Sequence, residues 1–167
     1  MTTPSVLFVL PVGGGGGGAH SVVQEAGGLV KLGVRSEIAV DRGNYLSFLK
    51  TYPELPSLRV LVREYDGPSD LAELMKQFGI AVATTNHSVA EVSSALKHLD
   101  GQSARAPQIA YYVQDYEPLF YARNSHPWKV AYGSYTAIPD ATLFAKTEWL
   151  RHVVYENHGV RVAKSRW

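Results

Sequence analysis

Short, continuous apolar runs alternate with segments of helical periodicity along most of the chain. The run Ser5-Val-Leu-Phe-Val-Leu10 is typical of a strand buried on both faces of a parallel sheet, because its hydrophobicity is continuous rather than alternating. Further strands are expected over 36–40, 58–62, 80–84, 108–113 and 141–145. Strands and helices in alternation require right-handed crossovers. They predict an α/β fold with a Rossmann-like, doubly wound, mostly parallel sheet and helices on both faces.

Four helices are expected, three between these strands and one after the last, and local signals mark their ends. Gly33 and Gly159 stand where the first and last helices would end in left-handed caps. Ser69 is expected to cap the second helix, and Ser88-Val-Ala-Glu91 has the form of a capping box for the third. The last helix is expected from Thr147 to about His158.

Composition excludes several classes of protein. The 167 residues suffice for one domain or for half of a two-domain enzyme, and 16 basic against 15 acidic residues give no reason to expect a nucleic-acid partner. The absence of cysteine excludes disulfides and Cys-ligated metal sites, which suits a cytoplasmic protein. We expect residues 1–160 to form the Rossmann-like domain and the basic tail 161–167 to begin an interdomain linker or to end a truncated piece.

Six consecutive glycines, Gly13 to Gly18, separate the first strand from the first helix. Backbone N–H groups without side chains at a helix N-terminus can approach an anion closely. No Gly-Lys-Ser/Thr follows, so a P-loop is excluded. The dinucleotide fingerprint Gly-x-Gly-x-x-Gly is matched automatically, and Asp41 stands where a ribose-binding carboxylate would. An NAD(P)-binding oxidoreductase domain is therefore one alternative, and a flexible connection is another.

Ligands of such sheets bind beyond the carboxyl ends of the strands. That rule selects the glycine loop with His20, Asp41, Asn86 with His87, the segment Gln114 to Glu117, and Lys146 with Thr147. Either Asp115 or Glu117 could act as a base or hold sugar hydroxyls, and Asp115 could equally cap the following helix.

Aromatic residues crowd the span from Tyr116 to Tyr135, which fits no regular element. We expect Tyr116, Tyr121 and Trp128 to be exposed, where they would suit stacking on a sugar ring or insertion at a membrane interface. The six histidines are scattered and lack a metal-ligand spacing, so no metal site is expected.

Three segments resemble family-4 glycosyltransferases of GT-B fold. Val6 to Pro11 with Gly17-Gly-Ala-His20 is similar to the family's first strand and its glycine pair, and Ala145 to Leu150 to its last N-domain helix. Tyr111-Tyr-Val-Gln-Asp-Tyr-Glu-Pro-Leu-Phe-Tyr121 is the more specific match. It resembles the signature of the rhamnosyltransferase-like branch that builds bacterial cell-surface polysaccharides.

The resemblance implies retaining transfer of a sugar from a nucleotide-sugar donor to a bacterial surface glycan, without metal or other cofactor. Such enzymes have two Rossmann-like domains with the active site between them. This chain would be the N-terminal, acceptor-side half and inactive alone. Its expected partners are the nucleotide sugar, the glycan acceptor and a C-terminal domain. Its expected location is cytoplasmic, compatible with the inner face of the plasma membrane. A non-catalytic binding module is a further alternative.

The resemblance also implies roles for individual residues. Gly17 and Gly18 match the pair that approaches the donor diphosphate, while Gly13 to Gly16 would be slack. Gln114 stands where many members have a histidine, and with Asp115 it is the catalytic candidate. The candidates for acceptor binding are His20, His87, Tyr116 and Glu117.

Overall fold

The computed structural model of the chain describes residues 4–99 and 106–165. The described residues form one sheet of seven strands, all parallel. The strands are β1 (Ser5–Val9), β2 (Arg35–Asp41), β3 (Leu61–Tyr65), β4 (Ile80–Ala83), β5 (Gln108–Tyr112), β6 (Thr142–Ala145) and β7 (Val162–Lys164). Their order across the sheet is β3-β2-β1-β4-β5-β6-β7.

Helices connect consecutive strands. The α-helices are α1 (Gly17–Lys31), α2 (Arg42–Thr51), α3 (Leu55–Leu58), α4 (Gly67–Met75), α5 (Asn86–Leu99), α6 (His126–Gly133) and α7 (Glu148–His158). Two short 3-10 helices, η1 (Glu117–Phe120) and η2 (Ser134–Thr136), flank α6.

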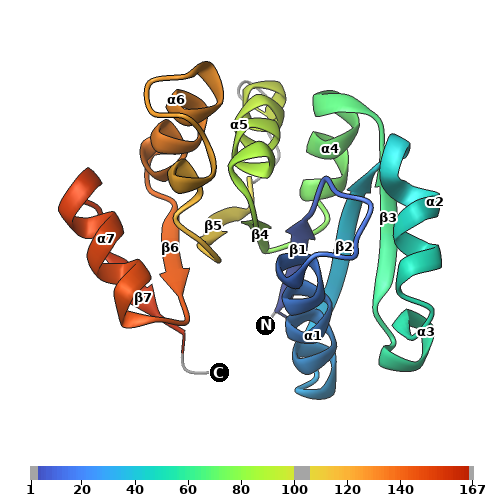
Figure 1. Ribbon diagram of the computed structural model, residues 1–167. Coiled ribbons are helices and arrows are strands. Elements are labelled where there is room, and N and C mark those ends of the chain that lie inside the picture. The colour runs from blue at the N-terminus through green and yellow to red at the C-terminus, as the bar shows by residue number, and fades with distance from the viewer. Residues whose placement is uncertain (1–3, 100–105, 166–167) are drawn as a thin grey trace.

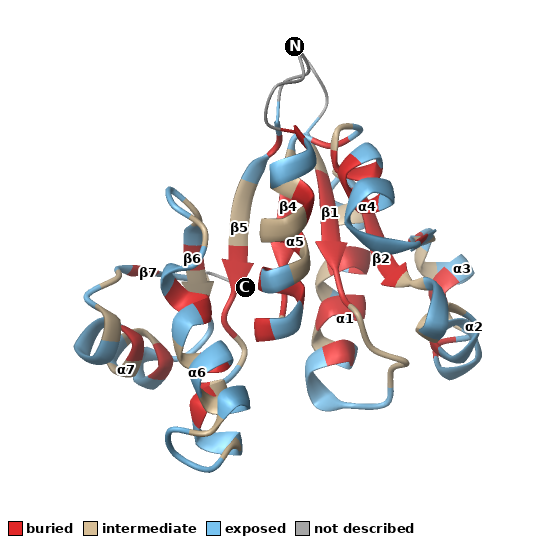
Figure 2. Ribbon diagram, turned by 90° about the horizontal axis from the view of Figure 1, so that it is seen from above, coloured by how far each residue is buried: buried red, intermediate tan, exposed pale blue. Residues whose placement is uncertain are grey.

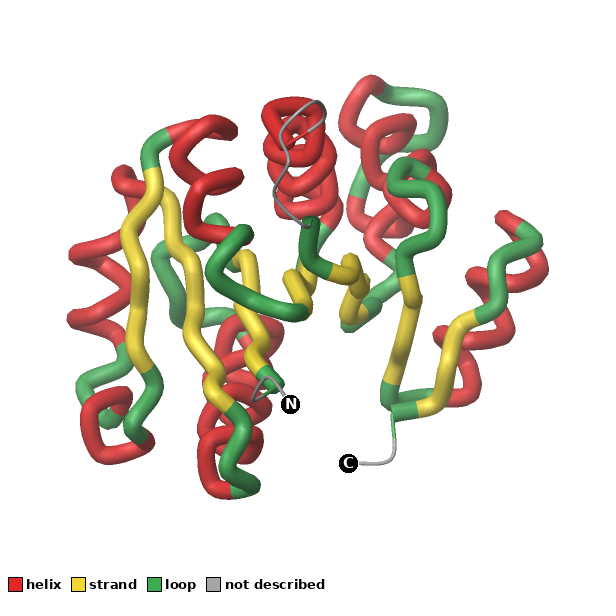
Figure 3. The backbone as a smooth tube through the Cα atoms, turned by 180° about the vertical axis from the view of Figure 1, so that it is seen from behind, coloured by secondary structure: helices red, strands yellow, loops and turns green. Residues whose placement is uncertain are grey.

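The helices lie in two layers, one on each face of the sheet (Figure 1, and from behind in Figure 3). From β1 the chain moves outward to β3, then crosses to β4 and moves outward in the opposite direction to β7. Right-handed crossovers in opposite directions put their helices on opposite faces, so α1 to α3 cover one face and α4 to α7 the other. The reversal between β1 and β4 is the topological switch point, where such folds bind ligands.

Each layer buries its own apolar core against the sheet. Val22, Val23 and Phe48 are fully buried on the α1–α2 side, while Leu71 and Val154 are fully buried on the α4–α7 side. Strand β1 is buried along almost its whole length (Figure 2). The predicted α/β fold is therefore confirmed, as are the left-handed conformations of Gly33 and Gly159, with φ of +79° and +67°.

Two predicted helix starts were wrong. Helix α4 begins two residues before Ser69, with Asp66 as its N-cap residue. Helix α5 begins at Asn86, so Ser88 lies inside it and forms no capping box. The Ser88 hydroxyl instead accepts hydrogen bonds from the backbone N–H groups of Thr84 and Thr85, at 2.7 and 2.9 Å. The Ser88 side chain, which the sequence pattern predicts to be an N-cap, therefore stabilises the turn that precedes α5.

The strand expected over 58–62 was also wrong. Leu58 ends α3, and the strand at this edge of the sheet is β3, three residues further on. Helix α2 was not predicted because it buries only Phe48 fully and leaves Leu46 and Leu49 exposed, so its sequence lacks a clear apolar stripe.

The C-terminal tail does not form a linker over its described part. Residues 162–164 are β7, which pairs with β6, and Val162 is only 6% exposed. The domain therefore extends beyond the predicted boundary at residue 160, whereas residues 166–167 lie outside the described residues.

The expectation that Gly13 to Gly16 are slack was wrong for Gly13 to Gly15, because this part of the loop is docked on α2 and the residue after it, Tyr52. Ser47 and Thr51 donate hydroxyl hydrogen bonds to the Gly13 carbonyl, both at 3.3 Å, and the Gly15 N–H donates to the Tyr52 hydroxyl at 3.1 Å. Gly14 has a φ of +91°, and a Cβ there would lie 2.7 Å from the Tyr52 ring.

Gly14→Ala should therefore lower the free energy of unfolding by about 1–3 kcal/mol, because the side chain would be strained and would meet the Tyr52 ring. Gly28→Ala is the matched control. Gly28 lies within α1 with open space around it, so alanine should raise stability by up to about 1 kcal/mol. Urea unfolding of both variants measures the two changes in the free energy of unfolding. Equal changes would contradict the conclusion that the loop is docked on α2.

Candidate functional site

A cavity of about 480 Å³ lies where the carboxyl ends of β5 and β6 meet the start of α1. It is lined by Gly17, Gly18, Ser21, Tyr112, Val113, Gln114, Asp115, Lys146, Thr147 and Leu150. Three of the strand-end groups expected from the sequence therefore converge: the end of the glycine loop, the Gln114 segment, and Lys146 with Thr147.

Gly18 lets the first turn of α1 approach Gln114 closely. A Cβ at Gly18 would lie 3.3 Å from the Gln114 side-chain oxygen, whereas one at Gly17 would meet nothing within 4 Å. The Gln114 amide nitrogen donates to the Thr84 carbonyl at 3.1 Å, which ties the end of β5 to the end of β4. Gln114 is therefore held in a defined position at the wall of the cavity.

The cavity combines features that suit an anionic group. The N-cap residue of α1 is Gly16, which supplies no side-chain hydrogen bond, so N–H groups of the first turn are open to a ligand. Helix α7 begins on the opposite wall, where Thr147 accepts from the Leu150 N–H at 3.2 Å.

Lys146 adds a positive charge to this wall. Its ammonium group lies 2.6 Å from a Glu25 carboxylate oxygen and 5.7 Å from the centre of the Tyr112 ring. The hydrogen bond to Glu25 raises the pKa of Lys146, so its charge is retained at neutral pH. Glu25 lies on α1, and the ion pair thus joins α1 to the end of β6.

Asp115 is exposed, and its carboxylate has no hydrogen-bond partner among the described residues. The alternative that Asp115 caps the following helix was wrong, since the N-cap residue of η1 is Tyr116 and no side chain caps it. The Asp115 backbone carbonyl accepts from the Tyr135 hydroxyl at 3.1 Å. The backbone is thus fixed, and Asp115 lines the cavity with an exposed carboxylate that can accept hydrogen bonds from hydroxyl groups.

Glu117 points away from the cavity, which argues against the predicted acceptor contact. One oxygen of its carboxylate accepts from the Asn86 N–H at 2.9 Å and from the Tyr111 hydroxyl at 3.1 Å. Burial raises the pKa of Glu117. The side chain therefore caps α5 across the fold, a contact that no local sequence pattern reveals.

Tyr116 was wrongly expected to be exposed. It is only 6% exposed, stacks on Tyr135, and has its hydroxyl 3.0 Å from a ring nitrogen of His158, whose pKa is lowered by burial. Tyr121 and Trp128 are half-buried. The aromatic crowding thus belongs largely to the packing of η1, α6 and η2 against one another and of α6 and η2 against His158 of α7.

The remaining predicted residues do not line this cavity. His20 and His87 are both exposed, on the first turns of α1 and α5. Asp41 lines a separate cavity of about 270 Å³, together with Tyr65 and Glu91. There the Tyr65 hydroxyl donates to the Glu91 carboxylate, and burial raises the pKa of both groups.

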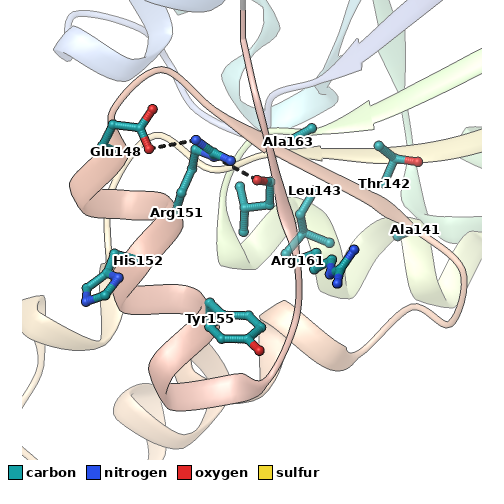
Figure 4. A pocket seen from close by; sticks show the side chains of 10 residues that line it. Ala141, Thr142, Leu143, Glu148, Arg151, His152, Tyr155, Arg161 and Ala163 are labelled. Atoms are coloured by element: carbon teal, nitrogen blue, oxygen red, sulfur yellow. Dashed lines mark hydrogen bonds and ion pairs between the residues drawn. The ribbon is translucent and has the colours of Figure 1, made fainter.

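A further open groove of about 780 Å³ lies between α7 and the strands β6 and β7 (Figure 4). Arg151 spans it, donating to Glu148 at 2.6 Å and to the Val162 carbonyl at 2.9 Å. None of the residues singled out from the sequence as ligand-binding candidates lines this groove.

Two searches of the described residues bear on cofactors and membranes. Over residues 4–99 and 106–165, no group of three or more His, Asp or Glu side chains is arranged to hold a metal ion. No helix in the same ranges is long and apolar enough to span a membrane.

Sequence reasoning missed several residues that shape the site. Ser47, Thr51 and Tyr52 hold the glycine loop, yet they lie on α2 or directly after it and not at a strand end. Ser21 of α1 lines the cavity, and Glu25 of the same helix pairs with Lys146 in the cavity wall. Their spacing of four residues, which places them on one helical face, is the only signal that could have found them.

No protein-family model and no curated protein sequence matches the chain. Solved structures match it in fold. HepE of Anabaena in complex with UDP-glucose superposes with a TM-score of 0.71 at 13% identity, over 98% of this chain and 44% of that one. An alpha-glucosyltransferase in complex with UDP gives a TM-score of 0.58 at 13% identity, over 98% of this chain and 43% of that one.

These likenesses show the fold. The chain has the Rossmann-like fold found within GT-B glycosyltransferase structures, and it spans less than half the length of HepE and of the alpha-glucosyltransferase.

Glu117→Gln tests the half-buried carboxylate beside the site. The pKa of Glu117 is higher in the folded state than in the unfolded state, so between these two pKa values the folded state binds more protons than the unfolded state. The contribution of Glu117 to stability therefore falls as the pH rises through this window. Glutamine keeps an acceptor for Asn86 and Tyr111. The unfolding free energy of wild type relative to Glu117→Gln should therefore fall as the pH rises from about 4, the ordinary pKa of a glutamate, through the raised pKa of the folded state.

Glu148→Gln is the matched control, because Lys164 and Arg151 lower the pKa of this exposed carboxyl. The contribution of Glu148 to stability is present above the pKa of the unfolded state and is lost as the pH falls through the pKa of the folded state. Its pH dependence is therefore opposite in sign to that of Glu117. Denaturant unfolding across the pH series measures both. The same sign for the two variants would contradict the burial of Glu117.

Proposed function

We propose that the chain is the acceptor-side half of a nucleotide-sugar glycosyltransferase. The observation that carries the proposal is the match of 98% of the chain to less than half of HepE, a protein whose structure holds UDP-glucose. The cavity at the start of α1 supports it, since a helix N-terminus without side chains suits a diphosphate.

The finer assignment rests on the segment Tyr111 to Tyr121. Its Gln-Asp-Tyr-Glu-Pro motif favours a retaining enzyme of family 4, in the rhamnosyltransferase-like branch acting on bacterial surface glycans. In this proposal Gly17 and Gly18 approach the donor diphosphate. Gln114 and Asp115 stand beside the reacting sugar, Asp115 accepting a hydroxyl hydrogen bond. A second domain supplies most donor contacts, and no metal or other cofactor takes part.

The NAD(P)-binding alternative has less support. Asp41, its ribose-binding candidate, accepts a hydrogen bond from Asn44 at 2.8 Å and lies in a cavity that Gly17 and Gly18 do not line. The part of the glycine loop nearest to Asp41 is docked on α2.

Titration of the ¹⁵N-labelled chain with UDP-glucose tests the proposal. We expect weak, millimolar binding, because most donor contacts would come from the second domain, with amide shifts concentrated at Gly17, Gly18, Gln114 and Thr147. We also expect no sugar transfer by the chain alone. Saturable micromolar binding of NADH that Asp41→Ala weakens would overturn the proposal in favour of the dinucleotide alternative.

Gly18→Val should weaken the response to UDP-glucose by about tenfold, or about 1.4 kcal/mol, because the side chain would press on Gln114 at the cavity wall. Gly28→Val introduces the same side chain in open space on the same helix, and it should leave binding unchanged. Equal losses in the two variants would show that helix stability, and not the cavity, controls binding.

A further inference from the structure

Helix α2 presents two large apolar side chains on a face that points away from the sheet. Leu46 is 77% exposed and Leu49 is 37% exposed, and their spacing of three residues places them on one side of the helix. Phe48, which is fully buried, lies on the opposite side, in the core. Helix α2 stands at the outer flank of the molecule beside β3 (Figure 1, and from behind in Figure 3). An apolar pair of this kind, unlike a single exposed leucine, suits an interaction surface.

The first turn of α2 carries an acidic group next to this pair. Arg42, four residues before Leu46 and therefore on the same face, pairs with Glu64 at 2.6 Å and with Asp66 at 2.5 Å. Asp70 accepts a hydrogen bond from the Asp66 backbone N–H at 2.8 Å. We call these four residues the Arg42 group. Its one guanidinium and three carboxylates give a net charge of −2.

The last turn of α2 carries a cation without a counter-ion. Lys50, four residues after Leu46, lies on the same face, is exposed and forms no ion pair among residues 4–99 and 106–165. Glu54, the next acidic residue in the sequence, lies beyond the helix as the N-cap residue of α3. Asp41, the N-cap residue of α2, adds to the negative charge of the first turn. The two ends of the helix therefore differ in charge even when Glu54 is counted.

We propose that this face of α2, formed by Arg42, Gly43, Leu46, Leu49 and Lys50, is the contact between two copies of the chain. The two helices lie antiparallel with the two-fold axis at Leu46, the more exposed of the two leucines. In a two-fold contact, each residue meets the residue that is equally far from the axis on the other side. Lys50 of one copy therefore meets the Arg42 group of the other, and symmetry makes this contact twice.

Gly43 and Leu49 complete the match. They stand three residues before and three residues after Leu46, so Leu49 of each copy lies over Gly43 of the other. Gly43 is exposed and has no side chain, which leaves room for Leu49 between the two backbones. A parallel arrangement would bring Lys50 against Lys50 and one Arg42 group against the other. Charge therefore selects the antiparallel arrangement.

Other occupants suit this face less well. An anionic lipid surface would be repelled by the carboxylates of the Arg42 group. The second domain of the proposed enzyme belongs at the cavity of β5 and β6, whereas α2 packs on β2 and β3, on the other side of β1. The inference does not rest on the proposed glycosyltransferase function, and self-association is measured without any nucleotide sugar.

Sedimentation velocity of the chain from about 10 µM to about 1 mM tests the proposal. We expect weak dimerisation, with a dissociation constant on the order of 100 µM, because one pair of short helices buries less than the roughly 1,200–2,000 Å² of a stable interface. Leu46→Ser with Leu49→Ser should weaken dimerisation at least about tenfold. Leu32→Ser is the matched control, because Leu32 is 62% exposed at the end of α1 and should dimerise like wild type.

A charge exchange tests the antiparallel arrangement. Lys50→Glu alone and Asp66→Lys alone should each weaken dimerisation several-fold. An equimolar mixture of the two variants should dimerise better than either one alone. In the mixed dimer the new glutamate faces an Arg42 group of net charge zero, and the remaining Lys50 faces an unchanged one. A mixture that dimerises no better than the separate variants would contradict the arrangement.

The lack of cysteine allows a site-specific check. Leu46→Cys, on the two-fold axis, should form a disulfide between two copies under mild oxidation. Lys50→Cys should form one far more slowly, because the two positions would lie about 12 Å apart along the helices. A chain that stays monomeric at every concentration would overturn the proposal, as would dimerisation that the double serine variant retains.

Discussion

The burial of β1 on both faces is the constraint on which the rest of the structure depends. A strand covered on both sides needs helices above and below it, and right-handed crossovers provide them only if the chain leaves β1 in one direction and returns to start again at β4. Because of this reversal, the loops after β1 and β4 run to opposite sides of the sheet. Thr84 then closes the gap by donating its hydroxyl to the Val9 carbonyl at 2.7 Å, and Gln114 donates to the Thr84 carbonyl. The ends of β1, β4 and β5 are therefore tied to one another beside the site.

The glycine run has two parts with different physical roles. Gly13 to Gly15 allow the backbone to lie directly on α2, with positive φ at Gly14 and Gly15 and hydrogen bonds to Ser47, Thr51 and Tyr52. Gly17 and Gly18 instead open the first turn of α1 toward the cavity. A docked loop loses less conformational entropy on ligand binding than a flexible one. The docking of Gly13 to Gly15 therefore lowers the entropic cost of binding a ligand at Gly17 and Gly18.

The sequence predicted the class of fold and the strand ends because buried parallel strands leave a strong, continuous apolar signal. It could not place α2, whose exposed Leu46 and Leu49 hide its amphipathic pattern, nor β7, which is three residues long at the edge of the sheet. Among the site residues, Gly18, Gln114 and Asp115 follow from the rule of carboxyl ends. Glu117 and Tyr116 were misplaced because their partners, Asn86 and His158, are 31 and 42 residues away in sequence.

The position of bound UDP-glucose tests the central claim most directly. A crystal structure of the chain soaked at millimolar concentration should show the diphosphate within hydrogen-bond distance of the backbone N–H of Gly17 or Gly18, with Gln114 at the wall of the same cavity. Occupancy of the cavity of Asp41 and Glu91 instead, with the start of α1 empty, would contradict the account.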